Sequence, residues 1–194
     1  MLLRLLAILM MSVAIAAPAL AADDPAAQRL DAYDDAVVAV MKQKLPFAVR
    51  AERFEGLVRS YYDMPAIAAL VVGPGWAGTA PADRTAAIAA LTRHSAVSLA
   101  RNFATYGGER FAIDPAVTTR GSSRIVRLTI SSGSSRNVLL HRMQQSGGAW
   151  RIVDVVADGV SQLAVQRADL AGAVASGGAA GMAKRLSELD ARAK

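Results

Sequence analysis

The chain contains two histidines, His94 and His141, and no cysteine. An imidazole could bind a metal ion or act as a general base, whereas the lack of thiols removes cysteine nucleophiles and thiolate ligands. Neither histidine has another His, Asp or Glu at metal-ligand spacing on the same predicted element. A zinc site is therefore not expected.

Two carboxylates, Asp154 and Asp158, could form a pair for acid–base chemistry near the end of the last predicted strand. We favour structural roles for both, because Asp154 falls within a strand and Asp158-Gly159 is typical of a turn before a helix. No G-x-S-x-G elbow is present, and Gly73-Pro74-Gly75 lacks the strand and lysine of a phosphate-binding loop. The sequence thus predicts no catalytic residue, no cofactor and no enzyme.

The aromatic residues Tyr61, Tyr62 and Trp76 could stack against a ligand. Aromatic side chains at helical spacing are more often part of a core, so we favour packing roles for them.

The elements that must position these residues begin with helices. Apolar residues recur at three to four positions, and prolines stand where first turns are expected. The predicted helices are 25–44, 46–62, 65–72, about 81–106, about 161–175, and a last helix after Gly177-Gly178 that ends near residue 192.

The periodicity then changes from 3.6 to 2 between residues 111 and 156. Glycine- and serine-rich turns separate the segments, and connections this short permit only hairpins, so the sheet is predicted to be an antiparallel meander. The four predicted strands are 111–119, 124–131, 136–143 and 150–156.

The N-terminus has the pattern of a secretory signal peptide. Arg4 precedes an apolar run at 5–17, and small residues at Ala19 and Ala21 favour cleavage after Ala21. The run has 13 residues, too few for a transmembrane helix, which needs about 20. Residues 22–194 are therefore predicted to form one exported domain, without a lipid anchor because no cysteine is available.

The positive charge is concentrated between Gly108 and Arg151, a segment that covers most of the predicted sheet and carries +5 of the net charge of +6. This segment contains seven arginines and only two acidic residues, Glu109 and Asp114. They either solvate the outer face of the sheet or form a basic surface for phosphate headgroups, and export makes nucleic acid an unexpected partner. The arginines are Arg110, Arg120, Arg124, Arg127, Arg136, Arg142 and Arg151.

Four segments together resemble the MlaC, or toluene-tolerance, family of periplasmic phospholipid-binding proteins. They are 62–68 (YDMPAIA), 73–76 (GPGW), 106–111 (YGGERF) and 150–161 (WRIVDVVADGVS). Within this family the chain looks most like the hopanoid-associated HpnM branch. His141, Met143 and Ala180 depart from the residues that are common in the family.

The resemblance implies an α+β fold: a four-stranded antiparallel sheet wrapped by helices, with a nuclear-transport-factor-like core. It also implies a monomeric periplasmic carrier that holds lipid tails between sheet and helices. Its partners would be an inner-membrane ABC-transporter complex and an outer-membrane lipoprotein complex. We expect the lipid to contact Leu70, Trp76, Leu99, Phe103, Val126, Leu128, Ile130, Leu139, Val160 and Leu163.

Two alternatives stay open. A small exported enzyme on the same kind of cone-shaped fold would need a polar pocket with a perturbed acid or base, and an Asp or His buried in the cavity would favour it. A docking module would instead have a solid core and an exposed apolar patch. Composition alone does not separate a lipid cavity from a filled core, and it does not distinguish phospholipid from a hopanoid-related lipid.

Overall fold

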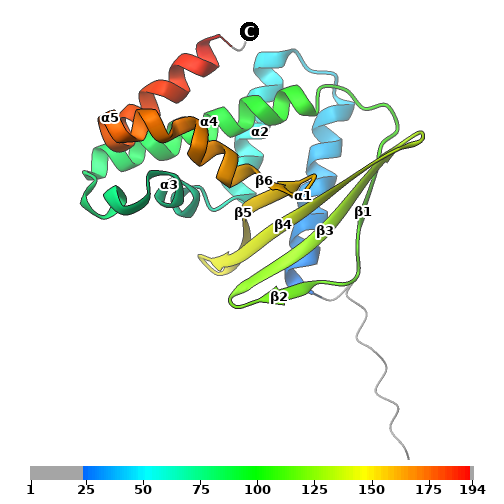
Figure 1. The fold of residues 1–194 in the computed structure, drawn as a ribbon. Coiled ribbons are helices and arrows are strands. Elements are labelled where there is room, and N and C mark those ends of the chain that lie inside the picture. Colours follow the sequence, from blue (N-terminus) through cyan, green and yellow to red (C-terminus); the bar gives the residue numbers. More distant parts are fainter. Residues whose placement is uncertain (1–23, 193–194) are drawn as a thin grey trace, which may run out of the picture.

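The computed structural model describes residues 24–192, so the predicted signal peptide and its cleavage after Ala21 lie outside the described residues. Helices occupy the first half of the chain, the sheet follows, and a long helix ends it (Figure 1). The elements are α1 (Pro25–Lys42), α2 (Phe47–Tyr61), α3 (Met64–Val72), the 3-10 helix η2 (Gly73–Gly78), α4 (Pro81–Asn102), β1 (Arg110–Ile113), β2 (Thr118–Arg120), β3 (Ser123–Ser132), β4 (Ser135–Ser146), β5 (Ala149–Ala157), β6 (Val160–Ser161) and α5 (Gln162–Ala191).

The sheet is antiparallel, with strand order β1-β3-β4-β5-β6 and with β2 paired to β3. The β3–β4 and β4–β5 turns contain Gly133 and Gly147, both at positive φ, as tight hairpins require. This confirms the predicted meander and mixed architecture.

The prediction of four strands was wrong, because the described chain has six. The segment predicted as one strand, 111–119, divides into β1 and β2. The Asp114 side chain accepts a hydrogen bond from Ala116 N at 2.8 Å, and Pro115 between them has no N–H to donate to a ladder. The other addition, β6, has two residues, too few to produce a visible alternation.

The two faces of the sheet differ, as the alternation predicts. On the inner face Val126 pairs with His141 and Leu128 pairs with Leu139. Helix α1 packs against this sheet, whereas α2, α3 and α5 pack together around α4 (Figure 1). The space between the inner face and the α4–α5 pair is where a site could form.

Two helix ends differ from the sequence expectation. Helix α4 ends at Asn102 rather than near Tyr106, because Phe103 leaves the helix and places its ring 6.2 Å from that of Phe54. The last two predicted helices are two halves of α5. They meet at Gly178, whose φ of 55° and ψ of −142° interrupt the helix where the glycine pair predicts a break.

Within residues 24–192, no helix combines the length and the apolar character needed to cross a membrane.

Candidate functional site

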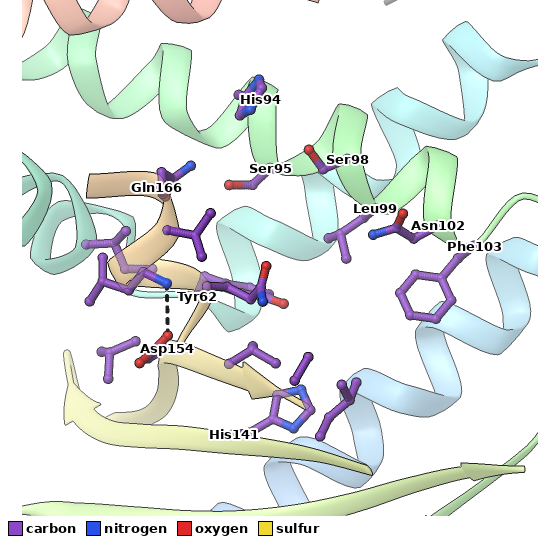
Figure 2. A pocket seen from close by; sticks show the side chains of 18 of the residues that line it. Tyr62, His94, Ser95, Ser98, Leu99, Asn102, Phe103, His141, Asp154 and Gln166 are labelled. Carbon is purple, nitrogen blue, oxygen red and sulfur yellow. Dashed lines mark hydrogen bonds between the residues drawn. The ribbon is translucent and has the colours of Figure 1, made fainter. Parts of the chain in front are cut away.

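A cavity of about 450 Å³ lies between the sheet and the helices (Figure 2). Apart from Asp34, His141 and Asp154, its wall on the sheet side is aliphatic and aromatic. This apolar wall comprises Val37 of α1 together with Phe111, Leu128, Leu139, Val153, Val155 and Ala157 of the strands.

The opposite wall is more polar. On α4, Ser95, Ser98 and Asn102 follow one another at helical spacing and line the cavity across from β4 and β5 (Figure 2). From α5, Gln166 joins them, and Val165 of the same helix is 40% exposed. The cavity is therefore amphipathic, with a mostly apolar wall on the sheet and a more polar wall on α4 and α5, where Asn102 and Val165 are exposed to solvent.

Asp154 organises the start of α5 rather than standing free in the cavity. Its carboxylate accepts a hydrogen bond from Ser161 Oγ at 2.7 Å. It also accepts one from Leu163 N at 3.1 Å, drawn as a dashed line in Figure 2. Asp158 is exposed on the following turn with a φ of 50°. The two acids thus occupy structural positions.

The aromatic residues Tyr61, Tyr62 and Trp76 do not form one cluster. Tyr62 lines the cavity, and its hydroxyl lies 3.1 Å from that of Tyr33. Burial raises the pKa of Tyr62 to about 12, so the phenol stays neutral. The Tyr61 hydroxyl donates instead to the backbone outside the cavity, and Trp76 lies under the Arg84 guanidinium.

Asp34 is the least expected residue of the cavity, and it was not among the residues predicted to form the site. It is 4% exposed, and its Oδ2 has no hydrogen-bond partner within residues 24–192. Burial, followed by repulsion from Asp31 and Asp35, raises the pKa of Asp34 to about 8. The carboxyl group is therefore protonated and neutral at pH 7. The signal in the sequence is an acid between Leu30 and Val37 on the apolar stripe of α1.

His141 is the second buried polar residue of the cavity. It is 2% exposed, and its Nδ1 finds no hydrogen-bond partner in the described chain. Burial lowers the pKa of His141 to about 4, so the ring is neutral at pH 7. Figure 2 shows the imidazole standing off β4 toward the interior.

The residues expected to contact lipid occupy several environments. Half of them line the cavity, namely Leu99, Phe103, Leu128, Leu139 and Leu163. Ile130 lines an adjoining cavity of about 500 Å³, which shares Phe103 and Leu139 with the first. Val126 is in the core and Trp76 is part of η2, while Leu70 and Val160 are 42% and 50% exposed.

No group of three His, Asp or Glu side chains within residues 24–192 is arranged to hold a metal ion. His94 instead pairs with Asp190, with Nδ1 and Oδ1 2.7 Å apart, and so joins α4 to the end of α5.

Several arginines of the sheet have partners within the protein. Arg124 Nε lies 3.4 Å from the Asp24 carboxylate, and Arg127 lies 3.8 Å from that of Asp114. Arg151 donates to backbone carbonyls at the end of α2. These contacts favour the interpretation that arginines solvate and brace the sheet.

Comparisons with known proteins agree with this geometry. The family model described as MlaC protein matches residues 31–188. Among solved structures, the chain is similar to the phospholipid-binding protein from Ralstonia solanacearum, determined in complex with a phospholipid. The TM-score is 0.74 at 18% identity, and the match covers 88% of this chain and 99% of that one. No protein with a curated description matches the chain by sequence.

Proposed function

The chain belongs to the MlaC family, and on that basis we propose that it is a lipid carrier that binds the acyl chains of phospholipid in the cavity between sheet and helices. The main evidence for this proposal is the amphipathic cavity of about 450 Å³. A phospholipid needs an apolar enclosure for its tails beside a polar opening for its headgroup. The phospholipid bound by the Ralstonia protein supports the same ligand class.

The distribution of polar groups orients the lipid. Tails lie against Leu128, Leu139 and Val155 on the sheet, where burial of apolar surface contributes about 25 cal/mol per Å². The headgroup lies toward Ser98 and Asn102 of α4, near the opening. The adjoining cavity of about 500 Å³, whose lining includes Asn102, Glu109 and Asp158, offers polar space next to the headgroup.

The carrier acts in the periplasm after cleavage of the signal peptide behind Ala21. As a monomer it shuttles lipid between an inner-membrane ABC-transporter complex and an outer-membrane lipoprotein complex. Cargo of the hopanoid-related type would place it in the HpnM branch. The signal-like pattern of residues 1–21 supports export. The intact mass of the periplasmic protein tests it, since a product that retains residues 1–21 contradicts a free shuttle.

Lipid extraction is the decisive experiment. Protein purified gently from the periplasm is extracted with organic solvent, and the extract is analysed by mass spectrometry. The expected result is one lipid molecule per chain, because an empty apolar cavity forgoes packing contacts. Protein that is lipid-free and takes up nothing from phospholipid vesicles contradicts the carrier function.

The buried Asp34 and His141 are the observation that favours the alternative, a small exported enzyme. Their protonation states argue against a general base, however. With a pKa of about 8, Asp34 already holds its proton at pH 7, and with a pKa of about 4, His141 takes one only in acid. Cargo recovered after incubation with an altered mass supports the enzyme, and cargo of unchanged mass supports the carrier.

A further inference from the structure

Two unpartnered polar side chains lie inside the cavity that we assign to lipid tails. Asp34 comes from α1 and His141 from β4, both are buried, and both line the same space. Asp34 Oδ2 and His141 Nδ1 have no hydrogen-bond partner in the described part of the chain. Buried polar atoms in native proteins are nearly always paired, so these two atoms require an explanation.

The surroundings offer no structural role for them. In the sheet His141 stands between Val126 and Val155, and on α1 Asp34 is flanked by Leu30 and Val37. An unpartnered polar group in such a place destabilises the fold relative to an apolar residue of similar shape. The hydroxyls of Tyr33 and Tyr62 bond to each other, and neither makes a hydrogen bond to Asp34 Oδ2 or His141 Nδ1. A role in folding therefore does not account for Asp34 and His141, whereas a ligand does.

We infer that Asp34 and His141 together bind a hydroxyl group carried on the hydrocarbon part of the ligand, away from its headgroup. This inference rests on the proposed carrier function, and it narrows the cargo to lipids with an oxygen on their apolar body. The headgroup itself has its own polar surface, at Ser98 and Asn102 near the opening.

A hydroxyl fits this pair better than other lipid oxygens do. A protonated carboxyl group donates a hydrogen bond, and Nδ1 of a neutral imidazole donates or accepts according to its tautomer. A hydroxyl can accept from Asp34 and can bond to either tautomer of His141. An ester carbonyl only accepts, and an unsubstituted acyl chain does neither, so it leaves both atoms unpaired.

A competition between two matched fatty acids tests the inference. Delipidated protein is incubated with equal amounts of stearic acid and 12-hydroxystearic acid, and the bound ratio is measured by extraction and mass spectrometry. We expect the hydroxylated acid to be preferred about tenfold, the effect of one well-formed hydrogen bond. Adding 18-hydroxystearic acid as a third competitor locates the hydroxyl along the chain.

Apolar variants assign the preference to the pair. Asp34→Leu and His141→Leu should each reduce the preference for the hydroxylated acid to about onefold, whereas Leu140→Ala, on the outer face of the sheet, should retain it. Both leucine variants should melt no lower than the parent in lipid-free form, because each removes an unpartnered group. The two leucine variants test the site independently, because one changes α1 and the other changes β4. If one variant does not fold, the binding preference of the other still decides.

The outcomes separate the two proposals. Equal binding of both acids by the parent, or a preference that survives in the leucine variants, overturns the hydroxyl site and leaves the carrier standing. Uptake of neither acid overturns the carrier function and the hydroxyl site together.

Discussion

The protonation of Asp34 and His141 makes the stability of the lipid-free protein depend on pH in a specific way. The perturbations are Asp34→Asn and His141→Gln, which remove each titration while keeping a polar side chain of similar size. Because the other titrating groups remain, the variant-minus-parent difference in unfolding free energy isolates the contribution of the removed group.

For Asp34, the pKa is raised from 3.8 to about 8 in the folded protein. Between these values the folded state holds a proton that the unfolded chain has released, so raising the pH destabilises the fold. The contribution is fully favourable below about pH 4 and is lost as the pH rises toward 8. Relative to the parent, the unfolding free energy of Asp34→Asn should therefore increase by about 1.4 kcal/mol for each unit that the pH rises, or by about 2.7 kcal/mol from pH 5 to pH 7.

For His141 the sign is opposite, because burial lowers the pKa from 6.5 to about 4. Between these values the unfolded chain binds the extra proton, so stability is fully present above about pH 6.5 and falls in acid. Relative to the parent, the unfolding free energy of His141→Gln should increase by about 1.4 kcal/mol for each unit that the pH falls from 6 to 4.5. In the parent, the opposite pH dependences of the two groups cancel between pH 4.5 and pH 6. Above pH 6.5, only the loss of stability due to Asp34 continues.

Urea unfolding of delipidated protein, followed by circular dichroism from pH 4.5 to 8, measures these differences by linear extrapolation. The double variant serves as the internal control, since its slope should equal the sum of the two single slopes. An ion pair between Asp34 and His141 would reverse both signs, because it would lower the carboxyl pKa and raise that of the imidazole. Reversed slopes, or slopes near zero in both single variants, would refute the assignment of two neutral groups.

Three further predictions concern the cavity and the helix that closes it. Leu128→Trp fills space on the cavity wall, so lipid uptake from vesicles should fall with little loss of melting temperature, whereas Leu140→Trp on the outer face of the sheet should bind normally. Gly178→Ala should lower the unfolding free energy by about 1–3 kcal/mol because its φ of 55° strains any side chain, while Gly177→Ala should not. Asp154→Ala removes the acceptor of Ser161 Oγ and Leu163 N, and urea unfolding should show a loss of about 1–2 kcal/mol.

The secondary structure was largely predictable because its signals are local. Pro25 and Pro81 stand in the first turns of α1 and α4, as predicted, since a proline N–H is not needed there. The break at Gly177-Gly178 follows from a conformation that other residues rarely adopt. The division of 111–119 into two strands was not predicted, because its alternation continues through Asp114-Pro115 although the hydrogen-bond ladder does not.

The cavity wall was only half predictable. Val126 and Leu128 are two residues apart on the same strand face, yet Val126 lies in the core and Leu128 lines the cavity. Alternation places both on the inner face, but the gap in front of each depends on where α1, α4 and α5 pack. The polar stripe of α4 was missed for a related reason, since the spacing of Ser95, Ser98 and Asn102 does not show whether these side chains face solvent or a cavity.

By itself, the sequence therefore determined the class of fold and the meander, because periodicity, prolines, glycines and short connections act within a few residues of each other. The resemblance of its segments indicated the MlaC family. The tertiary structure alone decided that Asp34 and His141, which are 107 positions apart in the numbering, line one cavity, where Asp34 Oδ2 and His141 Nδ1 have no partner among the described residues. The local pattern does not show whether a polar residue on an apolar stripe meets water, a partner or an empty cavity, because elements distant in the chain close that space.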